Sequence, residues 1–245
     1  MNASTNNLVI DVGNTLTKLA VFSGNNLLEV QKVGSVHLAH IQQFVNSFCI
    51  KNAIISSVAG MPVDCQKYLS NNVNLVHFSS TMSLPIKNCY RTPETLGSDR
   101  VAAAVAANLL YPNSNVLVVD SGTALTYEVI TIKAEYLGGA ISPGIAMRFK
   151  ALNSYTSKLP LLNITNTYPF IGSSTVDSIW SGVLNGVVNE VDAYIDSLKI
   201  DYPQLEIVFT GGDAFFFDKK LKNSIFVHPN LVLIGLNRIL NYYNE

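Results

Sequence analysis

The sequence predicts an α/β protein made of two related lobes, and three observations support this fold class. Segments with the two-residue apolar alternation of strands precede segments with helical spacing, which is typical of α/β layers rather than of a β-sandwich. This order of segments occurs twice along the chain. Each occurrence contains an apolar run followed by Asp-x-Gly, at Asp11 and again at Asp120. We therefore expect a duplicated half-domain, with lobes at 1–114 and 115–245.

The first lobe is expected to contain five strands followed or interrupted by three helices. Alternating apolar residues predict the strands, and apolar residues spaced by three or four positions predict the first two helices. An Ala-rich run that starts at Ser98 or Asp99 and stops before Pro112 predicts the third helix. The expected strands cover 7–11, 17–22, 27–33, 53–58 and 74–78, and the first two helices cover 37–48 and 63–70.

The second lobe repeats this pattern after a connector at 111–115. The helix expected at 175–198 begins with a variant of the capping box, in which Asp177 follows Ser174 by three positions. The two aspartate turns are 109 positions apart, which is too long for a solenoid repeat and suits a duplicated half-domain. The other expected elements are strands at 115–119, 124–130, 134–138 and 205–210, and helices at 144–157 and from about 229.

The composition is that of an ordinary globular protein. The chain has 245 residues, of which 48% are hydrophobic and 13% charged, and its formal net charge is -1. It lacks the basic excess of nucleic-acid binders, an apolar run long enough to span a bilayer, and the pattern of a signal peptide. Three widely spaced cysteines, Cys49, Cys65 and Cys89, argue against a disulfide scaffold or a zinc site. We therefore expect a cytoplasmic protein that binds neither nucleic acid nor membrane.

The two Asp-x-Gly turns, "DVGNT" and "DSGTA", predict a phosphate site. Backbone N–H groups in such turns converge on an anion, and Asp11 and Asp120 offer hard oxygen ligands to a cation. Lys18 either reaches the phosphates as a point charge or faces solvent. A single such turn is equally typical of a plain hairpin, whereas two in equivalent positions favour a ligand site in a cleft between the lobes. The small turn residues are Gly13, Asn14 and Thr15 in the first turn, and Ser121, Gly122 and Thr123 in the second.

Two glycine pairs, Gly138–Gly139 and Gly211–Gly212, admit two interpretations. They allow either the close approach of a nucleotide to the backbone or tight turns with positive φ. The chain contains neither a P-loop motif nor the dinucleotide-binding motif after its first strand.

The segment "YRTPETLGSDR", residues 90–100, carries the most chemistry. Asp99 either caps the Ala-rich helix or acts as a general base, since both roles need an ionised carboxylate. Arg100 is suited to a carboxylate, and Tyr90 offers a hydroxyl group. A substrate with an alcohol at one end and an acid at the other would suit these three residues.

Six motifs, in this order and spacing, closely resemble those of the type III pantothenate kinases: "DVGNTLTK", "YRTPETLGSDR", "VVDSGTALT", "GGAISPG", "GSSTVDS" and "TGGDA". That family belongs to the superfamily of acetate and sugar kinases, heat-shock ATPases and actin. The resemblance covers nearly the whole chain. It implies two lobes of actin-like, ribonuclease H-like fold, each with a mixed sheet and flanking helices, and an active-site cleft between them.

The resemblance implies ATP-dependent phosphorylation of pantothenate to 4'-phosphopantothenate, the first step of coenzyme A biosynthesis, in a homodimer. It implies Mg²⁺ near Asp11, a monovalent cation (K⁺ or NH₄⁺) at Asp120, and Asp99 as the general base. The implied ATP-binding residues are Asp11, Val12, Gly13, Asn14, Thr15, Leu16, Thr17, Lys18 and Thr123. The implied substrate-binding residues are Tyr90, Gly97, Ser98, Asp99, Arg100 and Thr175.

Two alternatives compete with this function. Another small-molecule kinase of the same superfamily, acting on a sugar or hydroxy acid, would keep the phosphate turns, although a neutral polyol would give Arg100 no carboxylate to bind. A nucleotide-binding regulator without turnover would bind ATP and yet release no ADP in response to pantothenate.

Overall fold

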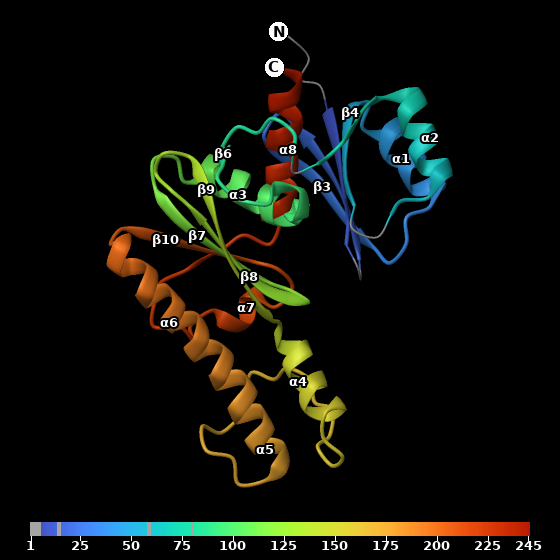
Figure 1. Ribbon diagram of the computed structural model, residues 1–245. Coiled ribbons are helices and arrows are strands. Elements are labelled where there is room, and N and C mark those ends of the chain that lie inside the picture. Colours follow the sequence, from blue (N-terminus) through green and yellow to red (C-terminus); the bar gives the residue numbers. More distant parts are fainter. Residues whose placement is uncertain (1–5, 14–15, 58–59, 80) are drawn as a thin grey trace. The chain divides into compact units, whose positions relative to one another are not determined.

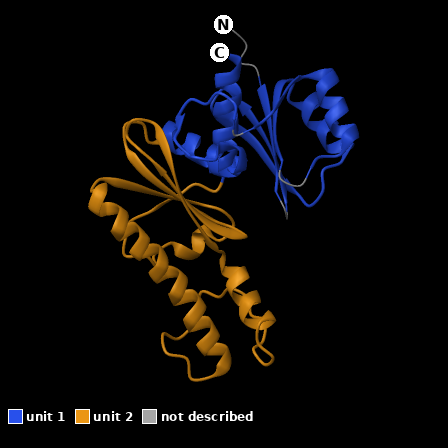
Figure 2. Cartoon of the chain, viewed as in Figure 1, with its two compact units in different colours: residues 1–110, 230–245 blue, residues 111–229 orange. Residues whose placement is uncertain are grey.

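The computed structural model describes residues 6–13, 16–57, 60–79 and 81–245, and it divides the chain into two compact units. Unit 1 comprises Met1–Leu110 and Asn230–Glu245, and unit 2 comprises Tyr111–Pro229 (Figure 2). Each unit is described by itself, so the cleft expected between the lobes stays a prediction. Asn14 and Thr15 of the first predicted phosphate turn lie outside the described residues.

Unit 1 is built on a five-stranded mixed sheet with the order β3-β2-β1-β4-β5. The strands β1, β2 and β3 pair antiparallel through consecutive hairpins, whereas β4 lies parallel to β1 and β5 parallel to β4. Both faces of β1 are covered, since Leu8, Val9 and Ile10 are all fully buried. The strands are β1 (Asn6–Val12), β2 (Thr17–Ser23), β3 (Asn26–Val33), β4 (Ile50–Ser57) and β5 (Asn74–His77), with a short β6 (Lys87–Asn88) later in the chain.

Helices cover both faces of the unit 1 sheet, α1 and α2 on one side and α3 and α8 on the other (Figure 1). The Ala-rich α3 packs closely along α8. A Cβ atom at Gly235 in α8 would overlap the carbonyl oxygen of Ala102 in α3, so the two helix backbones meet at this point. The helices are α1 (Leu38–Ser47), α2 (Val63–Asn72), the 3₁₀ turn η1 (Pro93–Thr95), α3 (Ser98–Leu110) and α8 (Leu231–Asn244).

The C-terminal helix α8 belongs to unit 1, which differs from the second lobe expected at 115–245. Buried amide side chains hold it there. The Nδ2 atom of Asn7 in β1 donates to the Oδ1 atoms of Asn237 (2.8 Å) and Asn241 (2.7 Å) in α8. Asn237 in turn donates to the carbonyl oxygen of Gly24 at 2.8 Å. These partners lie more than 200 residues apart in sequence, so no local pattern indicates them.

Unit 2 repeats the sheet of unit 1, because its own strands have the order β11-β10-β7-β8-β9. Again three consecutive strands pair antiparallel, and the fourth and fifth lie parallel to the first. The predicted pair of related α/β lobes is therefore confirmed. The strands are β7 (Asn115–Ser121), β8 (Ala124–Ile130), β9 (Glu135–Pro143), β10 (Leu205–Thr210) and β11 (Phe226–Val227).

The helices of unit 2 cover an apolar core that β7, β8 and β10 share with the long helix in the unit. That helix, predicted at 175–198, is found as three consecutive segments. Its start is capped as expected, since the backbone N–H of Asp177 donates to Oγ of Ser174 at 3.1 Å. The helices are α4 (Ile145–Ser154), α5 (Thr175–Trp180), the π-helical η2 (Ser181–Asn185), α6 (Gly186–Asp201) and the short α7 (Ala214–Phe217). None of the helices in the described part of the chain has the length and apolarity that a membrane crossing needs.

One strand is longer than predicted. β9 continues to Pro143 through the pair Gly138–Gly139, which the sequence analysis considered as a site of nucleotide approach. A Cβ atom at Gly139 would overlap the backbone of Tyr127 on the neighbouring strand, and Gly138 has a φ of 105° where the pairing register shifts. These glycines therefore serve close strand pairing and a bulge.

Candidate active site

The first predicted site carboxylate, Asp11, lies near the end of the central strand β1 of unit 1. Its cross-strand partner on β2 is Lys18, and its partner on the parallel strand β4 is Ser56. Cross-strand partners share a face of the sheet, so all three side chains project from the same side. Lys18 is half-buried on that face rather than fully exposed.

The environment of Asp11 raises its pKa to about 6. Burial, which disfavours the charged form, is the largest cause. The ammonium group of Lys18 lowers the pKa, and the negative charge of Asp99 raises it again. Asp99 is thus close enough to Asp11 for the two charges to interact. Unit 1 therefore brings together the carboxylates of two motifs that lie 88 positions apart in sequence.

The start of α3 is anchored against the end of β4. The hydroxyl groups of Ser98 and Ser56 are hydrogen-bonded at 2.9 Å, and Ser56 is buried. Asp99 follows in the first turn, where its Oδ1 accepts the backbone N–H of Arg100 at 2.8 Å while the residue stays exposed. A Cβ atom at Gly97 would lie 2.5 Å from that oxygen, so a larger residue there would displace the Asp99 side chain. Asp99 therefore makes a local bond with the next residue in the first turn of the helix, and it is exposed to solvent.

Two further predicted residues, Tyr90 and Arg100, meet within unit 1. The guanidinium carbon of Arg100 lies 5.6 Å from the centre of the Tyr90 ring, which is a cation–π distance. Arg100 is buried and Tyr90 is half-buried. The loop and the helix start thus form one local cluster with Asp99.

In the rest of the first turn, mainly backbone groups are available to bind a ligand. Val12 belongs to the apolar core and Thr17 is buried, whereas Leu16 is exposed. The N–H of Gly13 donates to the carbonyl oxygen of Leu16 at 3.2 Å, which closes the turn. Val12, Gly13 and Thr17 line a small pocket of about 250 Å³ that is completed by two segments, Gly34–Val36 and Gly60–Pro62.

The equivalent turn of unit 2 contains Asp120, in the same position of β7 as Asp11 in β1. The N–H of Gly122 donates to the carbonyl oxygen of Ala124 at 3.0 Å, so this turn is tighter than the first. Thr123 lies at its tip and is exposed, whereas its neighbours Gly122 and Ala124 are half-buried. The hydroxyl group of Ser121 is fully buried and has no hydrogen-bond partner among the described residues.

Backbone packs closely on this second turn from two sides. A Cβ atom at Gly211 (φ 94°) would overlap Ser121 and the Asp120 carboxylate, and one at Gly144 would overlap the carbonyl oxygens of Gly122 and Thr123. Gly211 therefore serves both a positive φ and a close approach, which favours the structural interpretation of that glycine pair.

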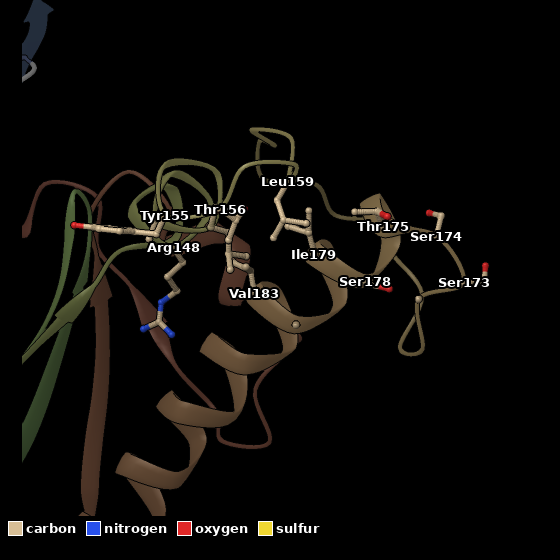
Figure 3. Close-up of a pocket in the computed structure, with 14 residues that line it drawn as sticks. Arg148, Tyr155, Thr156, Leu159, Ser173, Ser174, Thr175, Ser178, Ile179 and Val183 are labelled. Atoms are coloured by element: carbon tan, nitrogen blue, oxygen red, sulfur yellow. Dashed lines mark hydrogen bonds between the residues drawn. The ribbon is translucent and has the colours of Figure 1, made fainter.

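The last predicted residue, Thr175, lines a large pocket of unit 2. This pocket has a volume of about 1120 Å³ and lies between α4 and the start of α5. Figure 3 shows hydroxyl side chains of Ser173, Ser174 and Thr175 at one end, and Leu159, Ile179 and Val183 along the wall. The pocket thus joins an apolar wall to a polar rim.

The residues present suit the cations that the family implies. Mg²⁺ takes hard oxygen ligands and is usually held by only one or two carboxylates. Asp11 and Asp99 supply two carboxylates whose charges interact. A bound cation would stabilise the charged form of Asp11, which burial disfavours. At the second turn, Asp120 offers a carboxylate close to backbone carbonyl groups.

The sequence analysis missed Ser56, which links the Asp11 strand to the start of α3. Its position at the end of a buried parallel strand, in "AIISS", was the available signal. Arg148 and Glu190 were also missed, because their ion pair of 2.7 Å joins residues 42 positions apart on two helices.

Comparison with known proteins identifies the family of the chain. The model of the family described as "Type III pantothenate kinase" matches residues 7–197. The type III pantothenate kinase of Phocaeicola vulgatus is 44% identical over 240 residues, covering 98% of this chain and 99% of that protein. That of Cytophaga hutchinsonii is 45% identical over 237 residues, covering 96% and 99%.

Solved structures support the fold alone, since their identities are low. A Campylobacter jejuni protein assigned to the Baf family of transcriptional activators has a TM-score of 0.62 and 21% identity, covering 97% of this chain and 98% of that one. The ROK hexokinase of Thermus thermophilus has a TM-score of 0.51 and 12% identity, covering 98% and 100%. From the family match over most of its length and the relatives of more than 40% identity, this chain belongs to the type III pantothenate kinase family.

Proposed function

We propose that this chain transfers the γ-phosphoryl group of ATP to the primary alcohol of pantothenate, the first step of coenzyme A biosynthesis, with Asp99 as the general base. The observation that carries the proposal is the interaction of Asp11 and Asp99 within unit 1. A phosphoryl transfer needs one carboxylate near the metal and phosphates and another near the attacking alcohol. The family of the chain supports the choice of ATP and pantothenate.

Asp99 takes the proton of the alcohol as its oxygen attacks the phosphorus atom. An exposed carboxylate at the start of α3 is free to reach a substrate, and its bond from the Arg100 N–H fixes its orientation. Ser98 bonded to Ser56 holds the helix start on the same side of the sheet as Asp11. The expected contribution of such a base is about 10²- to 10⁴-fold in rate.

Arg100 binds the carboxylate of pantothenate and Tyr90 contributes a hydroxyl group to the same substrate. The cation–π contact between them orients both groups together. This pair separates pantothenate from the sugars that other kinases of this fold phosphorylate, because a neutral polyol would leave the guanidinium group without a counter-charge. We assign Gly97, Ser98 and Thr175 to the same substrate, although Thr175 lies in unit 2 and is the least constrained of these assignments.

Groups at both aspartate turns neutralise the negative charges of the ATP phosphates. The first turn, from Asp11 to Lys18, binds phosphates and Mg²⁺, which when bound neutralises the charge that builds on the phosphates. In the second turn Thr123 contacts a phosphate and Asp120 holds K⁺ or NH₄⁺. The half-buried position of Lys18 beside Asp11 supports a role on the phosphates.

We place the enzyme in the cytoplasm as a homodimer. Unit 2 exposes large apolar side chains around its large pocket, with Tyr155, Phe170 and Ile171 exposed by 90%, 78% and 82%. Exposed apolar groups of this size are typical of interaction surfaces. Sedimentation analysis of the purified chain tests the dimer, and a monomer at micromolar concentration would contradict it.

Coupled release of ADP tests the function. We expect ADP release that depends on pantothenate and on K⁺ or NH₄⁺, and little release with glucose, N-acetylmannosamine or simple hydroxy acids. Release with a sugar alone would favour a different kinase of this fold. Binding of ATP without ADP release in the presence of any acceptor would favour the regulator alternative. The assignment of the Campylobacter protein to a family of transcriptional activators is the reason to test this alternative.

A further inference from the structure

Arg148 is a charged side chain that none of the proposed catalytic roles uses, yet it is part of a polar network that joins several elements of unit 2. It lies in the first turn of α4 and is only 20% exposed. Its Nε donates to the carbonyl oxygen of Pro143 at 2.8 Å, and one terminal nitrogen donates to Oγ of Ser142 at 3.0 Å and to Oε2 of Glu190 at 2.7 Å. Three elements, β9, α4 and α6, therefore meet at one guanidinium group.

Glu190 completes the network from α6. Its other oxygen accepts the hydroxyl group of Tyr127 on β8 at 3.2 Å. Burial alone would raise the pKa of Glu190, but hydrogen bonds from Ser142 and Arg148 and the charge of Arg148 hold it below its ordinary value. Glu190 is thus ionised at neutral pH, and the pair is a charge-assisted bond rather than a neutral one.

The network does not serve the large pocket directly. Arg148 contributes to the wall of that pocket, but Figure 3 shows its guanidinium group directed away from the hydroxyl groups of Ser173, Ser174 and Thr175. Its Nε and one of its two terminal nitrogens are also already bonded, to Pro143, Ser142 and Glu190. A direct role in binding a substrate in the pocket is therefore not its main use.

The segment that Arg148 holds packs on the second aspartate turn. Ser142 and Pro143 are the cross-strand partners of Leu125 and Ala124, which directly follow that turn. A Cβ atom at the next residue, Gly144, would overlap the carbonyl oxygens of Gly122 and Thr123. A shift of Ser142–Gly144 by less than one ångström is consequently transmitted to the turn, because there is no space between the two backbones.

We propose that Arg148 is a positioning residue, which together with Glu190 fixes the Ser142–Gly144 segment and through it the phosphate-binding geometry of the turn at Gly122–Thr123. The inference rests on the proposed role of that turn in ATP binding. Arg148 does not act on the turn directly. It acts only through the backbone of β9 and the start of α4.

Calorimetric binding of Mg·ATP in the absence of pantothenate tests the proposal. Arg148→Ala is expected to weaken ATP binding about 10- to 100-fold, because the hydrogen bonds from a charged group that fix the Ser142–Gly144 segment are lost. Arg148→Lys keeps the charge beside Glu190 but loses the bond from Nε to Pro143, and is expected to bind with intermediate affinity. The matched control is Arg238→Ala, which removes the ion pair between Arg238 and Glu245 (2.6 Å) on unit 1 and should leave ATP affinity unchanged.

A second variant keeps the test valid if Arg148→Ala fails to fold. Glu190→Gln preserves the shape of the side chain and is expected to weaken ATP binding about 3- to 10-fold, equivalent to the loss of a charge-assisted bond. ATP affinity equal to wild type in this variant, or in a folded Arg148→Ala with a lowered unfolding temperature, would show a purely structural role and overturn the proposal. Failure of wild type to bind ATP would instead contradict the proposed function.

Discussion

The two aspartate turns occupy the same place in two sheets of the same topology, and they differ in what stands opposite each aspartate. In unit 1 the cross-strand partner of Asp11 is Lys18, and in unit 2 the partner of Asp120 is Thr126. The parallel neighbours are both hydroxyl residues, Ser56 and Thr210. The scaffold is therefore shared, and one position on the second strand decides whether a fixed ammonium group stands beside the carboxylate.

The two related lobes therefore differ in the source of the positive charge that lies beside the aspartate. In unit 1, the ammonium group of Lys18 lies beside Asp11, on the face that we propose binds phosphates. Thr126 supplies none, so a positive charge beside Asp120 has to come from a soluble cation, in agreement with the proposed K⁺ or NH₄⁺ site. Unit 1 also adds a second carboxylate, Asp99, from the helix start bonded to Ser56.

The largest expected effect concerns the group that only unit 1 possesses. Asp99→Asn keeps the side-chain shape and removes the base, so kcat should fall about 10²- to 10⁴-fold with little change in KM for pantothenate. Steady-state kinetics measures both constants. Turnover at the wild-type rate would show that the carboxylate only caps α3.

The two aspartates themselves provide the next test of the comparison. Asp11→Asn should lower kcat/KM for Mg·ATP about 10²- to 10³-fold, as expected when a group that stabilises the charge of the transition state is lost. Asp120→Asn should abolish stimulation by K⁺ while leaving the dependence on Mg²⁺ intact. Titrations of activity with each cation measure the two responses. If the activities of the two variants respond equally to Mg²⁺ and to K⁺, the two turns do not have distinct roles in cation binding.

A pH dependence of stability sharpens the comparison further. The pKa of Asp11 is raised from 3.8 to about 6, so the folded protein holds a proton that the unfolded chain releases, and stability falls as pH rises through this window. Asp11→Asn removes this loss. In Mg²⁺-free buffer the variant should be more stable than wild type by about 2 kcal/mol at pH 7, with no difference at pH 3.

Urea unfolding between pH 3 and pH 7 measures this effect. Asp120→Asn is the matched control in the equivalent position of unit 2. A stability difference between wild type and Asp11→Asn that is constant across this pH range would contradict the raised pKa.

The smallest effect comes from exchanging the residues opposite the aspartates. Lys18→Thr should raise KM for ATP about 10-fold, since an exposed or half-buried charge contact is worth about 1 to 2 kcal/mol. Thr126→Lys should place an ammonium group beside Asp120 and make activity independent of K⁺. Assays with and without K⁺ in the four combinations of these residues measure the exchange. Continued K⁺ dependence in Thr126→Lys would locate the cation elsewhere.

Local pattern alone determined the elements of this protein. The alternation of apolar residues predicted the strands except the two-residue β6 and β11, and the Ala-rich run predicted α3 to within a residue at its start. The repeated Asp-x-Gly predicted the duplication, because a strand end followed by a turn is written in consecutive residues. The motif order identified the family, which the comparisons confirm.

Tertiary structure decided what joins residues far apart in sequence. Only the fold brings Asp99 near Asp11, bonds Ser98 to Ser56, and places α8 in unit 1 through Asn7 and the packing of Gly235 on Ala102. Such contacts depend on how sheets and helices pack over many tens of residues, whereas periodicity reports only on neighbours within a turn or two. For the same reason, the network of Arg148 and Glu190 could not be predicted from the sequence, because its partners come into contact only when α4 and α6 pack together.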